Sequence, residues 1–191
     1  MKGLVDNFVF RGIMAGHAIR DLQSSGLLRI RTSTPEENRD HDLFASVAEK
    51  IRASSKAMQA NYRVLYAFEN SIRELLISVF TEADGADWFD KRTNVDMKKK
   101  FESRRKSEET NMWHCGRHCH PLYYLDFADL ALLITNHWEL FKALFPDQGW
   151  VNSRIKETER TRNVIAHTNE LPSTEGARME MHLRDWISQV G

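Results

Sequence analysis

Apolar residues recur at helical spacing along most of the chain, and no stretch alternates between apolar and polar residues as a strand does. Two stripes are the clearest, one over residues 56–82 and one over residues 122–145, and turn residues follow both. The first stripe is formed by Met58, Tyr62, Leu65, Phe68, Ile72, Leu76 and Val79, and the second by Tyr123, Phe127, Leu130, Ile134, Trp138, Phe141 and Phe145. Spacings of three and four predict two long amphipathic helices.

Weaker patterns predict further helices over 3–24, from Ser33-Thr34-Pro35-Glu36-Glu37 to about 52, and over 150–168. A hydroxyl cap followed by proline and acidic residues is a strong helix start. A last helix follows the turn at 171–173, with an apolar face formed by Met179, Leu183, Trp186, Ile187 and Val190. Residues 90–120 lack a comparable stripe. The patterns predict an all-α helical bundle over 56–191 with an N-terminal helical arm over 1–55.

One charged residue interrupts the apolar side of the helix predicted over 150–168. The stripe of Val151, Ile155 and Thr158 continues onto Arg162 before it reaches Ile165. A guanidinium in such a position must be paired, lie at an interface or face a ligand. Asn163 follows directly, and His167 lies about 140° around the helix axis from Arg162, so the length of the arginine lets both reach one small target.

An arginine, a polar residue and then a histidine five positions after the arginine resemble the R-x4-6-H motif of HEPN domains. More specifically, the chain resembles the HEPN domain of the Swt1-like type over roughly residues 60–171. The stretches that carry the resemblance are 68–75 (FENSIREL), 85–88 (GADW), 124–130 (YLDFADL), 137–141 (HWELF) and 162–171 (RNVIAHTNEL). Residues 1–55 resemble no family that we can name.

The resemblance implies a HEPN-like helical bundle and a metal-independent endoribonuclease that works as a homodimer without a cofactor. In such enzymes the 2′-hydroxyl of RNA attacks the adjacent phosphodiester and leaves a 2′,3′-cyclic phosphate. Histidine titrates near neutral pH, so His167 is the expected proton acceptor. Arg162 is the expected phosphate clamp. Asn163 is expected to orient His167 or to donate to a phosphate oxygen.

A second interpretation stays open beside the catalytic one. Many HEPN domains are non-catalytic modules that dock a protein or bind nucleotide or RNA, and Arg162 would then pair with Glu159 or with an acid on another helix. Glu69 and Arg73 form an i, i+4 pair, which is either an exposed pair of little consequence or a support for the cleft. Asp126 is a weaker candidate for the same supporting role, the alternative being a solvated flank.

The charge of the chain is balanced overall but not locally. The whole chain has 27 Lys and Arg against 27 Asp and Glu, which excludes a uniformly cationic nucleic-acid binder. Residues 91–106 nevertheless contain eight basic and two acidic residues, a net charge of +6. Phosphate backbones attract such segments, so the expected RNA contacts are Lys98, Lys99, Lys100, Arg104 and Arg105. The alternative is a solvated helix face or loop.

A run of potential metal ligands precedes the second long stripe: His114, Cys115, His118, Cys119 and His120. Zinc sites usually draw four ligands from two separated pairs. This run has no C-x2-C pair and no second cluster elsewhere in the sequence. We therefore expect a polar loop rather than a metal site.

No run approaches the roughly 18 apolar residues of a membrane span, and charged residues interrupt the N-terminal apolar segment. A cytoplasmic protein without membrane contact is expected. The expected partners are RNA, a second copy of the chain, and a protein partner or antitoxin that restrains a toxin-like or defence activity.

Overall fold

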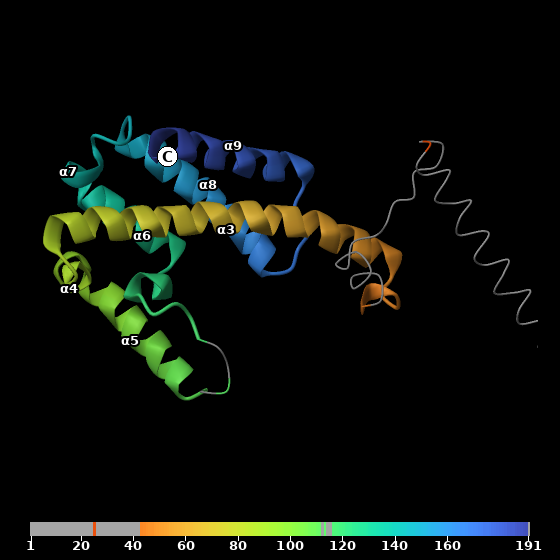
Figure 1. The fold of residues 1–191 in the computed structure, drawn as a ribbon, viewed down its shortest axis with the longest axis horizontal. Coiled ribbons are helices and arrows are strands. Elements are labelled where there is room, and N and C mark those ends of the chain that lie inside the picture. The colour runs from red at the N-terminus through yellow and green to blue at the C-terminus, as the bar shows by residue number, and fades with distance from the viewer. Residues whose placement is uncertain (1–24, 26–42, 112, 114–115, 191) are drawn as a thin grey trace, which may run out of the picture. The chain divides into compact units, whose positions relative to one another are not determined.

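The computed structural model of the chain describes residues 25, 43–111, 113 and 116–190, and Figure 1 shows its ribbon. The chain divides into two compact units, residues 1–48 and 49–191. The helix predicted over 3–24 and the cap at 33–37 lie outside the described residues. The prediction that a helix continues to about residue 52 is wrong, because turns and a bend occupy 45–47. The role of the predicted arm over 1–55 stays a prediction.

The second unit consists of helices, and no strand occurs among the residues described, which confirms the all-α prediction. The elements in chain order are α3 (Glu49–Asp84), α4 (Trp88–Arg92), α5 (Val95–Glu109), the 3₁₀ helix η1 (Pro121–Tyr124), α6 (Phe127–Asn136), α7 (Trp138–Phe141), α8 (Gln148–Ala166) and α9 (Ser173–Val190). Figure 1 shows α9 running alongside α3, and α5 on the other side of α3, where it packs on η1.

Helix α3 is the longest element and begins earlier than the stripe over 56–82 predicts. Residues 53–55 contain no proline or glycine, so nothing in the chain breaks the helix there. Its end is set by Gly85, whose φ of 80° lies in the left-handed region that glycine adopts without strain. The predicted stripe is buried from Leu65 to Leu76, but Tyr62 is exposed, and Phe80 takes a core position instead.

The single helix predicted over 122–145 is wrong, although its apolar positions still face inward. Three short elements, η1, α6 and α7, occupy this stretch. Asp126 adopts an extended conformation as the N-cap of α6, and its backbone N–H donates to Asp129 Oδ2 at 2.9 Å, one half of a capping box. His137 leaves the helical region at φ −120° and ψ 37°, and its ring donates to the carbonyl of Arg92 at 3.0 Å.

Aromatic side chains from distant parts of the sequence form the core. Phe68 meets Trp186 edge to face at 5.6 Å between ring centroids, which joins α3 to α9. Phe80 stacks on Trp88 at 4.8 Å and meets Phe141 at 5.6 Å. The last predicted helix forms as α9, with Met179 and Trp186 buried, whereas Ile187 is exposed. This core holds α3 and α8 in adjacent positions, which places the motif next to α3.

Candidate functional site

The R-x4-6-H motif lies at the C-terminal end of α8. Asp147 caps the start of this helix by accepting from the backbone N–H of Trp150 at 2.8 Å. Arg162 and Asn163 belong to the last turns, and His167 is the C-cap residue, at φ −92° and ψ 17°. The backbone N–H of His167 still donates to the carbonyl of Asn163 at 3.2 Å. The histidine therefore sits where the helix ends, close to the end of the predicted span of 150–168.

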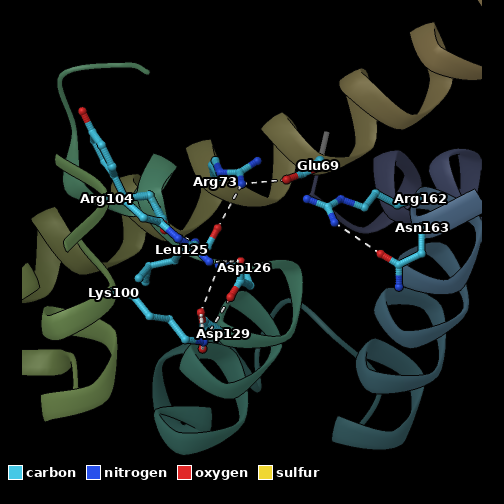
Figure 2. Close-up of polar contacts among 10 residues, drawn as sticks. Glu69, Arg73, Lys100, Arg104, Leu125, Asp126, Asp129, Arg162 and Asn163 are labelled. Carbon is cyan, nitrogen blue, oxygen red and sulfur yellow. Dashed lines mark hydrogen bonds and ion pairs between the residues drawn. The ribbon is translucent and has the colours of Figure 1, made fainter. Parts of the chain in front are cut away.

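Arg162 is half-buried and not on the buried stripe itself. The stripe of Thr158 continues onto Thr161, which is buried, so the prediction that it lands on Arg162 is off by one position. Within the described residues Arg162 forms no ion pair, either with Glu159 or with another acid. Its Nη1 donates to Asn163 Oδ1 at 3.2 Å. Figure 2 shows its guanidinium directed from α8 toward the turn of α3 that carries Glu69.

His167 is exposed and begins the loop that returns to α3. Thr168, which follows, has a φ of 55°, and the backbone N–H of Leu171 contacts Met58 Sδ at 3.3 Å. The loop after the motif is thereby held against the N-terminal half of α3. The described side-chain contact of Asn163 is with Arg162 and not with His167. Asn163 thus orients the arginine of the motif.

Glu69 and Arg73 form a buried pair rather than a surface one. Arg73 Nη2 lies 2.6 Å from Glu69 Oε1, and the arginine is 7% exposed. The same Nη2 lies 3.5 Å from the carbonyl of Leu125, while the guanidinium covers the ring of Tyr123 at 5.2 Å. Figure 2 shows this arginine between α3 and the segment that enters α6. The pair therefore ties α3 to the segment that precedes α6.

Asp126 belongs to a second charge network, which joins α5 to the start of α6 (Figure 2). Lys100 Nζ lies 2.8 Å from Asp129 Oδ2 and 3.1 Å from Asp126 Oδ2, and Arg104 Nη2 lies 2.7 Å from Asp126 Oδ1. Arg104 also donates to the carbonyl of Tyr124. Asp129, which the sequence analysis missed, was signalled by its position three residues after Asp126, the spacing of a capping box.

The network shifts the titration of its members. Partial burial acts to raise the pKa of Asp126, but hydrogen bonds from Arg104 and Lys100 outweigh it and hold that pKa below its ordinary value. The hydrogen bond to Asp129 raises the pKa of Lys100. Two of the five cations predicted to contact RNA are thus neutralised by carboxylates of the protein itself.

The other three predicted RNA contacts differ among themselves. Lys98 Nζ donates to the carbonyl of Asp90 at 2.6 Å, and Arg105 forms an exposed pair with Glu109 at 3.2 Å. Lys99 is exposed and has no ion pair or hydrogen bond from its side chain in the described part of the chain. Lys99 is therefore the cation of this group that solvent and ligands reach most freely.

The histidines of the predicted polar loop pack on aromatic rings. His118 stacks on Tyr123 with 4.3 Å between ring centroids, and His120 stacks on Trp88 at 5.5 Å. His120 also caps η1, because its Nδ1 accepts from the backbone N–H of Leu122 at 3.1 Å. Burial lowers the pKa of His120. His114 and Cys115 lie outside the described residues, among which no group of three or more metal-binding side chains occurs.

The family model described as Swt1-like HEPN matches residues 63–191, about two thirds of the chain, which confirms the resemblance and extends it through α9. No curated protein and no solved structure matches the chain. Among the described helices, none has the length and apolar character that a membrane crossing requires.

Proposed function

The chain belongs to the Swt1-like HEPN family, and on this basis we propose that it is a metal-independent endoribonuclease. In the proposed reaction the 2′-hydroxyl of RNA attacks the adjacent phosphodiester, and the products carry a 2′,3′-cyclic phosphate and a 5′-hydroxyl. The observation that carries the proposal is the state of Arg162, a half-buried guanidinium with no acidic partner in the described part of the chain.

Arg162 has the properties of a phosphate clamp. A guanidinium binds phosphate through two parallel N–H donors, and its stabilisation grows as charge develops on the oxygens. An arginine is rarely fully buried unless it is paired, and Arg162 is half-buried with no acidic partner in the described part of the chain. Here one nitrogen is held by Asn163 Oδ1, which fixes the guanidinium and leaves its other donors for a ligand.

His167 supplies the proton transfers in this proposal. Its imidazole accepts the proton of the 2′-hydroxyl, and the imidazole of a second copy protonates the leaving 5′-oxygen. The ring is exposed at the end of α8, so it can approach an RNA strand. Because the proton moves through histidine and the developing charge is met by arginine, this scheme needs no metal ion.

The proposal includes a homodimer, since two copies of the motif supply both the base and the acid. The mass of the protein in solution, measured by light scattering after gel filtration, should be that of two chains. The specific activity should fall on dilution below the dissociation constant of the dimer. A monomer with undiminished activity at all concentrations would contradict this part of the proposal.

The experiment for the activity itself is cleavage of single-stranded RNA in EDTA. The wild-type protein should produce fragments with cyclic phosphate ends, and Arg162→Ala and His167→Ala should each abolish cleavage without changing the circular dichroism spectrum. Arg160→Ala is the matched control, because Arg160 is an exposed arginine of the same helix. Cleavage that persists in His167→Ala would refute its role, and no cleavage by the wild type would favour the non-catalytic alternative.

The biological setting proposed is a toxin-like or defence effector in the cytoplasm, restrained by a protein partner or antitoxin. Production of the wild-type chain in cells without that partner should slow growth. The His167→Ala variant, produced at the same level, should leave growth unchanged. Equal growth inhibition by both chains would separate toxicity from the proposed cleavage.

A further inference from the structure

A pocket of about 540 Å³ lies along α3. One side is formed by about three turns of α3, and the other by residues 116–118 and Tyr123 of η1. The lining residues whose side chains matter here are Tyr62, Tyr66, Glu69, Arg73, His118 and Tyr123. The volume falls within the range of about 300–1,000 Å³ typical of ligand sites.

The α3 side of the pocket presents two exposed tyrosines. Tyr62 and Tyr66 are 58% and 60% exposed, and their ring centroids lie 6.2 Å apart. Within the described residues neither hydroxyl forms a hydrogen bond. Two large rings left side by side in solvent are unusual on a helix whose other aromatic residues are buried. Their flat faces and free hydroxyls are therefore available to a ligand.

The opposite side is a preformed aromatic stack. His118 lies on the ring of Tyr123 with an interplanar angle of 30°. The hydroxyl of Tyr123 donates to Glu74 Oε1 at 2.9 Å, and burial together with this bond raises the pKa of Tyr123 to about 12. The backbone N–H of His120 donates to His118 Nδ1 at 3.1 Å, so Nε2 carries the hydrogen in the neutral ring. The stack thus offers a ring face and a hydrogen-bond donor.

The charges around the pocket are already compensated. Arg73 is paired with Glu69 at 2.6 Å, and Arg117, which also lines the pocket, is paired with Glu108. A pocket for phosphate would leave its guanidinium groups without carboxylate partners, as Arg162 is within the described residues. An aromatic pocket with neutralised cations instead suits a flat, uncharged group with polar edges. A nucleobase has that chemistry, and stacking on aromatic side chains is the usual way in which single-stranded RNA is held.

We propose that this pocket binds one unpaired nucleobase of single-stranded RNA, stacked against Tyr62 and Tyr66. The pocket shares the Glu69 turn of α3 with the motif, because the guanidinium of Arg162 points toward that turn (Figure 2). A strand whose phosphate is held by Arg162 can thereby place a neighbouring base in the pocket. The inference rests on the proposed function for the identity of its ligand, and it deepens that function by assigning a base-binding subsite.

The test measures RNA binding independently of RNA cleavage. Binding uses a fluorescent 2′-O-methyl RNA strand, which cannot be cleaved, and the same strand carrying one abasic residue. Tyr62→Ala and Tyr66→Ala should each weaken binding by roughly 5- to 150-fold, the change that corresponds to about 1–3 kcal/mol of stacking per base. Tyr66→Phe keeps the ring and should bind within about twofold of wild type, since stacking needs only the ring face.

Two controls make the result specific to the pocket. Met181→Ala removes a similarly exposed side chain from α9 and should not change binding. The two tyrosine variants should unfold at the wild-type urea concentration, because both rings are largely solvent-exposed. Wild-type protein should bind the intact strand more tightly than the abasic strand, and Tyr66→Ala should lose part of that preference.

The outcomes separate this inference from the proposed function. If the alanine variants bind both strands as the wild type does, or if the wild type does not bind the strand, the base-binding pocket is refuted, whether or not RNA is cleaved. If binding depends on the tyrosines but the wild type cuts no RNA, the pocket stands and the endoribonuclease proposal falls. If the preference for the intact strand is absent in the wild type, the ligand is the backbone and not a base.

Discussion

Replacing Glu69 with alanine should destabilise the domain because it leaves Arg73 without its carboxylate. Arg73 is 7% exposed, and its other described polar contact is a 3.5 Å approach to the carbonyl of Leu125. Its Nε is already buried and has no hydrogen-bond partner among the described residues. A guanidinium that keeps its charge in such a site has to draw water in or shift the segment that precedes α6.

The magnitude follows from the burial of the two partners. Removing one member of a buried ion pair costs about 3–5 kcal/mol. The side chain of Glu69 is 18% exposed, so water reaches part of the site, and we expect a loss near the lower limit, about 3 kcal/mol. For a domain of this size that loss lowers the melting temperature by roughly 6–12 °C. Glu69→Gln keeps a hydrogen-bond acceptor and should lose about 1–2 kcal/mol.

The assay is urea unfolding followed by far-ultraviolet circular dichroism. The dependence of the unfolding free energy on urea concentration is compared between variants, to check that they unfold in the same way. The double variant Glu69→Ala with Arg73→Met should recover part of the loss, because it removes the unpaired charge together with its partner. Glu109→Ala is the matched control, since it breaks an exposed i, i+4 pair with Arg105 and should cost less than about 0.5 kcal/mol.

Two results would refute this reasoning. If Glu69→Ala costs no more than Glu109→Ala, the pair with Arg73 is not a buried structural pair in solution. If the double variant is less stable than the sum of the two single variants predicts, the charge of Arg73 is not what makes the loss of Glu69 costly.

Three further predictions concern other parts of the domain. The pKa of Asp126 is lower in the folded chain than in the unfolded chain, where it is near 4. Its contribution to stability is therefore fully present above the unfolded pKa and is lost as the pH falls through the folded pKa. Asp126→Asn should flatten the pH dependence of the unfolding free energy in urea between about pH 2 and pH 5. Lys99→Ala should weaken RNA binding and reduce the slope of log binding constant against log salt concentration by about 1 without changing stability, as measured by fluorescence anisotropy over a salt series. Lys100→Ala should instead lower the free energy of unfolding in urea by about 1–3 kcal/mol, because it leaves buried Asp129 without its cationic partner. Phe80→Ala should cost about 3–5 kcal/mol in the same unfolding assay, since its ring is fully buried between Trp88 and Phe141; a loss under about 1 kcal/mol would place Phe80 outside the core.

The apolar pattern located helices better than it located their ends. The stripe of α3 predicted the buried run from Leu65 to Leu76. The stripe over 122–145 predicted residues most of which are buried, yet that helix is interrupted twice. Neither interruption is marked by glycine or proline. The break at Asp126 depends on a capping box, and the break at His137 depends on a hydrogen bond to Arg92, which lies in another element. A contact between distant residues, such as His137 with Arg92, cannot be recognised from the sequence around either residue.

In the candidate site, too, the sequence predicted local spacing but not the contacts between distant segments. The order of Arg162, Asn163 and His167 and the i, i+4 spacing of Glu69 and Arg73 are visible in the sequence. The burial of Arg73 is not, since it depends on η1 and the start of α6 covering α3. The exposed tyrosine at position 62 also fitted the apolar stripe, because spacing along a helix does not say how far the neighbouring helices extend over it.

By itself, the sequence determined that this protein is helical, which faces of its helices are apolar, and that it has the motif and block order of a Swt1-like HEPN domain. The first two properties follow from spacing along one helix, which is short-range information, whereas the third is a resemblance of sequence blocks to a known family. Only the tertiary structure decided which cations are free, because the acids that neutralise Lys100 and Arg104 lie on another element. It also decided that Arg162 faces α3 with no acidic partner among the residues that the structure describes, and that two tyrosines border a pocket there. Pairing and pocket formation need groups that are distant along the chain to meet, and their meeting depends on how the core packs.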